Sequence, residues 1–539
     1  MLKSTASQFL LTILMKNNSF LLFSFLWMIL LCSVSLNAIA QEDKKSQPKK
    51  IYYEADVSIG DEDNFPGVRK MIGNVKFEHE GTIGYCDSAY QYEGDNSMEA
   101  FGKQVTIYIN DSVTLYGKHV FYDGNLRRAS IDKQVRLQDN TATLYTDSLI
   151  YDLNTDAAYY LTGGKTVNKE NTLTSMKGIY YTKDNQILLQ DDVLLVNETY
   201  TMTCDSLMFN TETEVVYFVS RTHLISEDNE IFTNSGWYET KTDNALLVDS
   251  VELLNDAQLV YGDSIYYDKN TGLGIGWNNI VIIDTAKDFI IKGNYAEYYE
   301  NGGISTVTDS AMLILVDKMD SLYFHADTFK IHIDSLQEPQ LLRGYNKVKF
   351  FRDDMQGACD SISYIMQDSM MIMYHNPVIW SNEYQLTGDT IIFYIIDSIK
   401  MEVHLIKAGF IVAGIYDDSE FDQIKGVSIV GHIVDKELTV VDVVGNAECF
   451  YYIQDEAKGL IGINSSVTSE MRIRFDKGEI QDLVLYNAPD GALDPDETVG
   501  EPDRKLKGFR WLNYYRPQTI EDIFIRPVTR NKEAEPVSD

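Results

Sequence analysis

A unit of about thirty residues repeats along most of this 539-residue chain and limits what it can fold into. The turns of the repeat contain Gly, Asn and Asp, which tolerate positive φ or hydrogen-bond their own backbone, so each predicts a β-hairpin. A fixed period of this length is typical of an elongated array, in which each hairpin buries its apolar face only against its neighbours. The aromatic residues that stand directly before the turns, at spacings of 28 to 32 residues, are Tyr92, Tyr122, Tyr151, Tyr181, Phe209, Tyr238, Tyr267 and Tyr299.

The apolar residues of the repeat alternate with a period of two. In DSLMFN, DSIYYD, DSISYI and DTIIFY, two apolar residues stand two positions apart and therefore share one face of a strand. Helical periodicity is essentially absent after residue 50, so we expect an all-β chain. The inward rows either line an open groove for a lipid or pack together as a filled core, and periodicity by itself favours the core. The pairs are Leu207 and Phe209, Ile265 and Tyr267, Ile362 and Tyr364, and Ile391 and Phe393.

An aspartate follows a small residue at the beginning of many of these segments. If these aspartates were catalytic, the active site would be copied in every repeat, which is implausible. We therefore expect the carboxylates to accept backbone N–H bonds at the start of a strand, in a row along one edge of the array. Calcium is the alternative ligand, although the glycine-rich nonapeptide of calcium β-rolls is missing. The positions are Asp87, Asp147, Asp205, Asp263, Asp360 and Asp389.

The sequence contains no motif that predicts catalysis. The eight histidines are scattered singly, and neither an HExxH motif nor a GxSxG elbow is present. Three of the cysteines, Cys86, Cys204 and Cys359, occupy the small-residue position before Asp-Ser, and without a CxxC pair we expect no zinc. We therefore predict no enzyme activity, no metal and no cofactor.

The charge balance excludes one class of partner. With 81 acidic and 46 basic residues the net charge is −35, and nucleic acid binding needs a cationic surface instead.

The amino terminus has the pattern of an export signal. Lys16 precedes an uncharged apolar run over residues 20–36, and small residues follow at Ala38 and Ala40. We predict that residues 1–40 are a signal peptide cleaved after Ala40, with Met15 as the true start. An uncleaved transmembrane anchor is the alternative, since the run is nearly long enough to span a bilayer.

Changes in the repeat suggest how the exported part is divided. Residues 41–335 form the first β array, and residues 336–415 continue it with a looser register. Residues 416–490 follow a different sequence pattern of strands and turns and form a C-terminal β module. Residues 491–539 begin as an acidic linker and end with the aromatic segment GFRWLNYYRPQTIEDIF, which we expect to dock against the array.

Three stretches resemble a known family. GNVKFEHEGTIGYCDSAYQY at 73–92, GWNNIVIIDTAKDFIIKGNYAEYY at 276–299 and GNAECFYYIQDEAKGLIGINSSVTSEMRIRF at 445–475 are similar to the organic-solvent-tolerance A family. That family (OstA/LptA-like proteins) includes the periplasmic lipopolysaccharide-transport protein A and the periplasmic domain of the outer-membrane translocon protein D. The likeness covers most of residues 50–490, in a form found in long homologues from the Bacteroidetes group.

The resemblance implies an elongated open β-jellyroll, a stack of antiparallel strands shaped as a V-shaped trough. It implies a periplasmic protein, either free or associated with the outer membrane, that binds lipopolysaccharide or a related glycolipid and bridges toward an outer-membrane translocon. Other jellyroll proteins of the transport system would join it end to end by strand addition. The inward apolar pairs named above, together with Leu149 and Tyr151, would then hold the acyl chains. A structural or adhesive β-solenoid of the envelope without a lipid ligand is the alternative.

Overall fold

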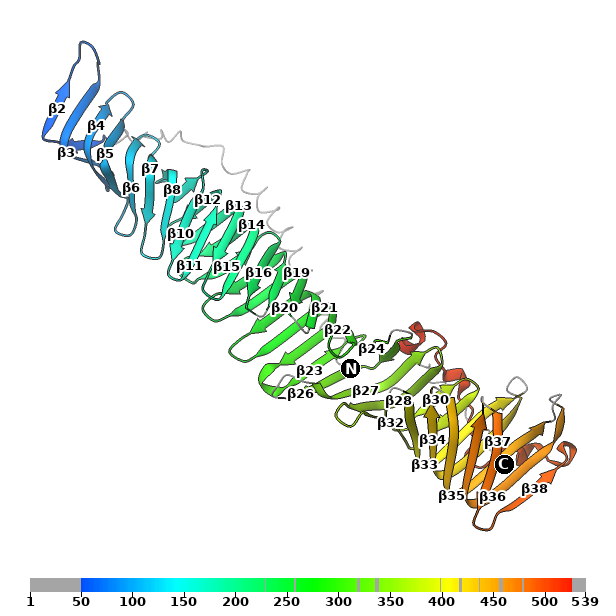
Figure 1. The fold of residues 1–539 in the computed structure, drawn as a ribbon. Helices are drawn as coiled ribbons and strands as arrows, with labels where there is room; N and C mark the ends of the chain where they lie inside the picture. Colours follow the sequence, from blue (N-terminus) through cyan, green and yellow to red (C-terminus); the bar gives the residue numbers. More distant parts are fainter. Residues whose placement is uncertain are drawn as a thin grey trace, which may run out of the picture.

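The computed structural model describes residues 50–525, except residues 228, 256–257, 318–319, 335–338, 398, 416–418, 436, 455–458 and 477–478. Within these residues the chain forms 38 strands, all in one sheet, and no α-helix. Paired strands are antiparallel, and the sheet extends as a long twisted body (Figure 1). The predicted all-β, elongated jellyroll fold is therefore confirmed. The predicted signal peptide lies outside the described residues.

The strands of the first half alternate between long strands and pairs of short ones. They are β1 (Tyr52–Glu54), β2 (Val57–Gly60), β3 (Val68–His79), β4 (Thr82–Tyr92), β5 (Ser97–Tyr108), β6 (Thr114–Asp123), β7 (Arg128–Gln138), β8 (Thr143–Asp152), β9 (Ala157–Tyr160), β10 (Gly164–Asn168), β11 (Asn171–Ser175), β12 (Lys177–Tyr181), β13 (Gln186–Val196), β14 (Tyr200–Asn210), β15 (Val215–Phe218), β16 (Thr222–Ser226), β17 (Glu230–Thr233), β18 (Ser235–Glu239), β19 (Asn244–Leu254), β20 (Gln258–Asp268), β21 (Leu273–Asp284) and β22 (Phe289–Tyr299).

The second half continues the same sheet with longer strands toward the end, followed by short 3₁₀ turns. They are η1 (Glu300–Gly302), β23 (Ile304–Thr308), β24 (Met312–Leu315), β25 (Leu322–His325), β26 (Thr328–Ile333), β27 (Pro339–Arg352), β28 (Met355–Ile365), β29 (Met370–Tyr374), β30 (Val378–Ser381), β31 (Tyr384–Thr387), β32 (Thr390–Ile395), β33 (Lys400–Ile415), β34 (Glu420–Val434), β35 (Glu437–Gln454), β36 (Leu460–Asp476), β37 (Glu479–Tyr486), β38 (Asp490–Asp494), η2 (Asp496–Thr498), η3 (Glu501–Arg504), η4 (Asn513–Tyr515) and η5 (Glu521–Phe524).

Each layer of the sheet bends at a corner halfway along its strands. In β7 the corner is made by Lys133 and Gln134, which have φ of 68° and 57°, and the pairing with β8 shifts there. Two consecutive left-handed residues form a bulge that turns the strand. The corner divides the sheet into two walls. Wall A contains the strand halves that lie next to the turn at 80–81 and to the equivalent turns of the later layers. Wall B contains the strand halves that lie next to the turn at 93–96 and to its equivalents.

The recurrent aspartates lie at this corner. All six side chains are exposed. Asp389 directly precedes β32, as expected, whereas the other five lie in the middle of a strand rather than at its start, which corrects their expected position. Asp87 accepts the backbone N–H of Lys103 at 2.8 Å, and Asp263 accepts the side-chain amide of Asn279 at 2.9 Å. The small residue before each aspartate is needed because the chain turns into the interior there.

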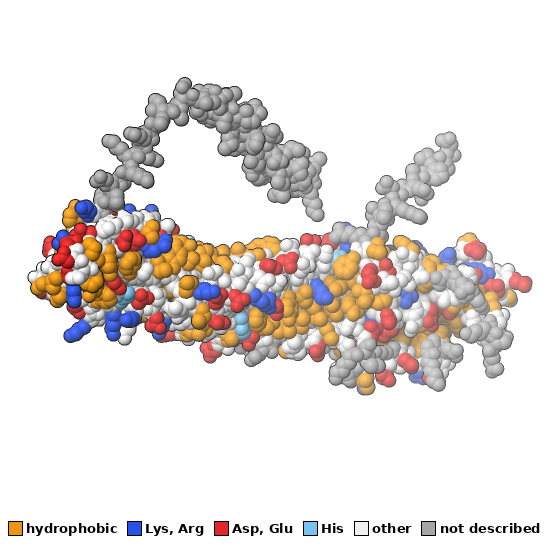
Figure 2. Space-filling model, turned by 90° about the horizontal axis from the view of Figure 1, so that it is seen from above, with side chains coloured by type: hydrophobic (Ala, Val, Ile, Leu, Met, Phe, Trp, Pro, Cys, Tyr) orange, Lys and Arg blue, Asp and Glu red, His pale blue; other side chains and the backbone are white. Residues whose placement is uncertain are grey.

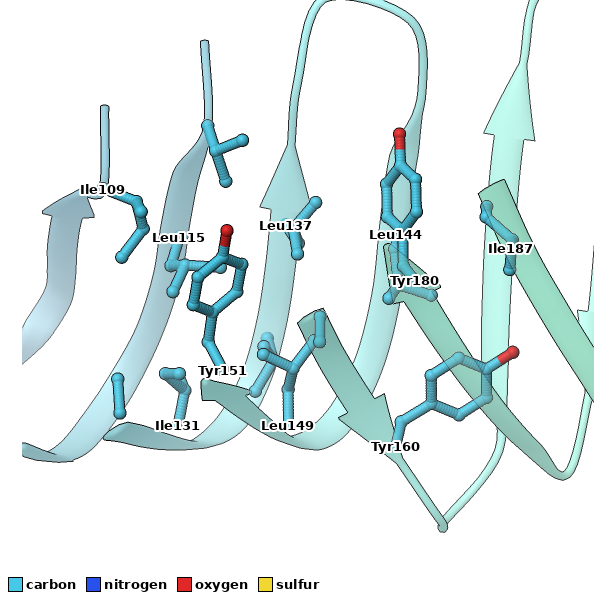
Figure 3. Close-up of a cluster of buried hydrophobic side chains, with 14 of the residues drawn as sticks. Ile109, Leu115, Ile131, Leu137, Leu144, Leu149, Tyr151, Tyr160, Tyr180 and Ile187 are labelled. Atoms are coloured by element: carbon cyan, nitrogen blue, oxygen red, sulfur yellow. The ribbon is translucent and has the colours of Figure 1, made fainter. Parts of the chain in front are cut away.

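Large and small side chains alternate along the inner face of wall B. Tyr122, Ala129, Tyr151, Ala158 and Tyr180 are successive cross-strand partners, and all five are buried. Figure 3 shows Tyr151 and Tyr180 within the buried cluster. Alternation of this kind lets facing layers interdigitate without voids. The buried apolar residues fall into two large clusters, which meet between Ile265 and Ile280.

The sheet runs without a break across the predicted boundaries near residues 335 and 416. β27 pairs with β26 and β28, and β33 pairs with β34. The boundaries themselves stay predictions. No helix among the described residues is long and apolar enough to cross a membrane.

The aromatic tail packs on the outer face of wall A. Its side chains cover apolar residues that point away from the interior, for example Phe509 and Trp511 on Phe421 at ring distances of 5.0 and 5.1 Å. Two buried glutamines clamp the tail backbone. The amide of Gln385 donates to the Arg510 carbonyl at 2.7 Å and accepts the Leu512 N–H at 2.6 Å. Gln423 makes the same pair of bonds, at 2.8 Å each, to Arg504 and Leu506. The expected docking of this segment is therefore present.

Candidate functional site

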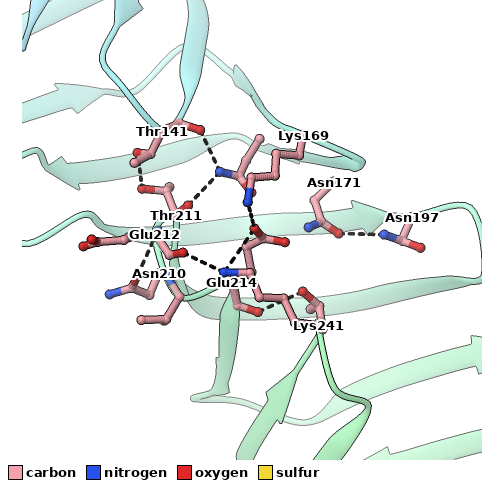
Figure 4. Close-up of polar contacts among 12 residues, drawn as sticks. Thr141, Lys169, Asn171, Asn197, Asn210, Thr211, Glu212, Glu214 and Lys241 are labelled. Carbon is pink, nitrogen blue, oxygen red and sulfur yellow. Dashed lines mark hydrogen bonds and ion pairs between the residues drawn. The ribbon is translucent and has the colours of Figure 1, made fainter.

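The two walls are sealed against each other in the first half of the molecule by polar side chains at the hairpin tips. The buried Asn168 amide donates to the carbonyls of Thr141 at 2.7 Å and Thr211 at 2.8 Å (Figure 4). Beside it, the Glu214 carboxylate pairs with Lys169 and, at 3.4 Å, with Lys241. Further toward the N-terminus, His79 Nδ1 and the Tyr122 hydroxyl lie 2.8 Å apart. We call this set of contacts among the hairpin tips of the two walls, between residues 79 and 241, the seam.

Tyrosines of wall B take part in the seam through their hydroxyls. The Tyr180 hydroxyl donates to the Asp139 carboxylate, which belongs to a tip of wall A. Burial, with the charge of Asp139, raises the pKa of Tyr180, and burial raises the pKa of Tyr122 to about 12. These phenols therefore remain protonated at any physiological pH.

Between β17 and β23, a part we call the open section, the inner rows nearer the hairpin tips are only half-buried, while residues nearer the corner, such as Val251 and Ile280, stay buried. On wall A, a row of inward-facing cross-strand partners contains the buried residues Met202 and Leu224. In the open section the residues of this row are only half-buried. The hydroxyls of Tyr238 and Tyr267 no longer reach across, since they donate to Asp243 at 2.6 Å and Glu300 at 2.8 Å on their own side. The half-buried residues of the wall A row are Ile231, Leu253, Val260 and Ile282, successive cross-strand partners.

Small residues on wall B leave room in the open section. Ala245, Tyr267, Gly274 and Tyr298 are successive partners, all half-buried. A Cβ placed on Gly274 would meet nothing closer than 3.7 Å, whereas one placed on Gly178 in the sealed part would lie 2.4 Å from the ring of Tyr160. The space beside Gly178 is thus filled by its neighbour, while the space beside Gly274 is not.

The open section offers an apolar, partly solvated strip. Its rows combine Ile, Leu and Val from wall A with tyrosine rings from wall B, and no lysine or arginine lies in either row. Hydrophobic side chains also reach the surface in patches along the face seen in Figure 2. Such a strip gains free energy by burying alkyl chains, at roughly 25 cal/mol per Å² of apolar surface.

The ten predicted lipid-contacting residues all face the interior, but they differ in accessibility. Tyr267 and Tyr364 are half-buried. The other eight are buried in the two clusters: Leu149, Tyr151, Leu207, Phe209, Ile265, Ile362, Ile391 and Phe393. Contact with a ligand needs exposed surface, so Tyr267 and Tyr364 are the residues of this set that a lipid could reach without rearrangement. Their role in binding stays a prediction.

Sequence reasoning missed the residue that creates the space, Gly274. Gly274 and Gly276 stand in GLGIG, two positions apart like the apolar pairs, and therefore face inward beside Tyr267 and Ile265. The space beside Gly276 is filled by Ile280, whose Cδ1 would lie 2.7 Å from an added Cβ, so only Gly274 leaves room. The spacing of the two glycines was the available signal, because glycine at an inward position removes a side chain from the core.

The described residues include no group of histidine, cysteine, aspartate or glutamate that could hold a metal ion. The four cysteines in this part of the chain are free thiols. Burial raises the pKa of Cys86 to about 12 and that of Cys449 to about 11, so they are unreactive at neutral pH.

Comparisons with known proteins give matches of two kinds, to solved structures and to a sequence family. LptH of Pseudomonas aeruginosa, described as the LptA homologous periplasmic component of the conserved lipopolysaccharide transport device, is a similar solved chain. It is 17% identical, the match covers 20% of this chain and 80% of that chain, and the TM-score is 0.19. No curated protein matches the sequence. The sequence profile of the OstA-like proteins matches residues 49–205 and 189–263. Residues 49–263 of the chain are therefore similar to the OstA-like proteins.

Proposed function

We propose that this protein binds lipopolysaccharide or a related glycolipid in the periplasm and carries it along a bridge that serves outer-membrane assembly. The observation that carries the proposal is the open section, where wall B has no side chain at Gly274 and the facing row of wall A is half-buried. An alkyl chain laid beside Gly274 would contact Tyr267 and Tyr298 on one side and the Ile, Leu and Val row on the other.

The charge of the protein suits acyl contacts rather than headgroup contacts in this strip. With a net charge of −35, the chain repels anionic headgroups at long range, and the strip has no cation to attract them. We therefore expect the apolar tails to enter the open section and the headgroup to stay in solvent.

The ends of the sheet fit the proposed bridge. Among the described residues, β1 and β2 pair only with β3, while β37 and β38 pair only with β36. Each end therefore presents unpaired backbone groups that another jellyroll could join by strand addition. A transport protein of the same fold, or the outer-membrane translocon, would be the partner.

The seam supports a second candidate function. Over residues 79–241 the walls are sealed and the core is filled, as in a structural solenoid of the envelope that holds no lipid. The same fold without a ligand would then act as a spacer.

Lipid co-purification separates the two functions. We would express the full chain in a lipopolysaccharide-producing host, purify it from the periplasm, extract it with organic solvent and analyse the extract by mass spectrometry. We expect acylated glycolipid with the wild type, and loss of most of it in Gly274→Phe, which fills the strip. Ile275→Phe, on the outer face of the same strand, is the control and should retain the lipid. A folded wild type that carries no lipid, and takes none up when offered, would favour the structural solenoid.

A further inference from the structure

A hollow of about 670 Å³ lies on the outside of wall A near the corner, away from the interior. It is lined by residues of β5 to β10, and its volume falls within the range of small-molecule sites. One row of direct cross-strand partners crosses this part of the wall, in the order Tyr116, Arg136, Tyr145 and Lys165. Adjacent strands lie about 4.8 Å apart, so aromatic and cationic side chains alternate along one side of the hollow.

The side chains of this row are available to a ligand. Tyr145 is 45% exposed and Lys165 is exposed. The Arg136 guanidinium lies over the Tyr116 ring, 4.0 Å from its centroid, which holds it in place while its N–H groups stay free to donate.

The hollow gathers positive charge in a strongly acidic protein. Lys103 and Lys118 line the corner side, opposite Arg136 and Lys165, and the acidic residue in the lining is Asp147. None of these four cations makes a salt bridge within the described residues. By contrast, Arg221, farther along the outside of the same wall, pairs with Glu252 at 2.7 Å. Four unpaired cations around one hollow create a local positive potential that attracts an anion of matching size.

We propose that this hollow binds an anionic saccharide, a sugar that carries phosphate or carboxylate groups. The Tyr116 and Tyr145 rings offer flat apolar faces to the C–H face of a sugar ring. Arg136 and the lysines supply charge-assisted hydrogen bonds to the anionic groups. A long polyanion such as nucleic acid does not fit, because the cations are confined to one hollow in a chain of net charge −35. The site lies outside the open section and does not rest on the proposed function.

Calorimetric titration of the full chain tests the proposal. The probe is a glucosamine disaccharide with two phosphates and no acyl chains, compared with the same disaccharide without phosphate and with inorganic phosphate. We expect the phosphorylated sugar to bind at least about tenfold more tightly than either, because each comparison removes one of the two kinds of contact. The double variant Arg136→Gln/Lys165→Gln should lower the affinity by at least about tenfold, whereas Arg221→Gln should leave it unchanged.

Three outcomes would overturn the proposal: no binding, equal binding by the double variant, or equally tight binding of inorganic phosphate. A polyglutamate peptide that competes as well as the sugar would overturn it in favour of an acidic protein partner. A second titration with vesicles that display the acylated form of the probe separates the sources. If the vesicle-bound sugar binds as the soluble one does, and binding is lost in the double variant, the ligand is a membrane headgroup. If the soluble sugar binds and the vesicle-bound sugar does not, the ligand is a free saccharide. Circular dichroism of each variant controls for folding, which these surface positions should not disturb.

Discussion

Replacing Asn168 by leucine should open the seam. The Asn168 side chain is fully buried, and its amide is the donor to the Thr141 and Thr211 carbonyls. Leucine has nearly the same shape but no donor, so two acceptors lose their partner in a poorly solvated place. An unsatisfied buried group costs about 1–3 kcal/mol, and Thr141 is half-exposed, so we expect a loss of about 2–4 kcal/mol.

Native-state hydrogen exchange is the suitable assay, because an array of repeats need not unfold in one cooperative step. Each 1.4 kcal/mol lowers protection about tenfold, so amides of β10, β11 and β13 should exchange roughly 30- to 1,000-fold faster. Asn154→Leu is the matched control. Asn154 is exposed, its amide donates to the Leu126 carbonyl at 2.8 Å, and water can replace it at a cost within about 0.5 kcal/mol. Equal effects of the two substitutions, or no effect of Asn168→Leu, would refute the reasoning.

Three further predictions concern the tail, pH and the thiols. Gln385→Leu removes both bonds to the tail backbone, so limited proteolysis should cut near residue 511 much faster than in the wild type, and an unchanged digestion pattern would argue against the clamp. Burial raises the pKa of Asp422 to about 6, above its unfolded value, so the native state favours the protonated form and loses stability as pH rises from about 4 to 6. Asp422→Asn should therefore raise the free energy of unfolding at pH 8 by roughly 2–3 kcal/mol, seen as a higher melting temperature, and leave both unchanged at pH 4. A gain at both pH values would contradict this prediction. Burial also raises the pKa of Cys359, so iodoacetamide should label this thiol only after denaturation, and rapid labelling of the folded chain would show that the core is not closed there.

The regular part of the fold follows from local sequence. Turn residues after Tyr92 and its repeats placed the hairpins of wall B correctly, because their φ preferences are local and recur every thirty residues or so. The alternation of Leu207 and Phe209 assigned the inward face for the same reason, since a strand has a period of two.

The contacts between the walls could not be predicted from that period. Asn168 and Thr211 are 43 residues apart, and the period does not specify which hairpin tips meet. The corner was hidden in β7, because Lys133 and Gln134 are not residues that favour positive φ. In β21 the same corner is made by Asn278 and Asn279, which do favour it, so there the sequence carried a signal. Because the corner was not predicted, the aspartates were placed at strand starts, where such residues usually act as caps. Finally, Gly274 leaves room on the inner face of wall B, and its effect depends on the neighbouring rings of Tyr267 and Tyr298 rather than on any motif.

Photocrosslinking to lipid tests the central claim most directly. A benzophenone side chain would be introduced at Tyr267 in the open section, at Tyr151 in the sealed part and at Ile275 on the outer face, each in the full chain with folding checked. After irradiation in lipopolysaccharide-producing cells, we predict a lipid adduct at Tyr267 and none at Tyr151 or Ile275. Adducts of equal yield at all three positions, or none at Tyr267 in a folded protein, would contradict the account.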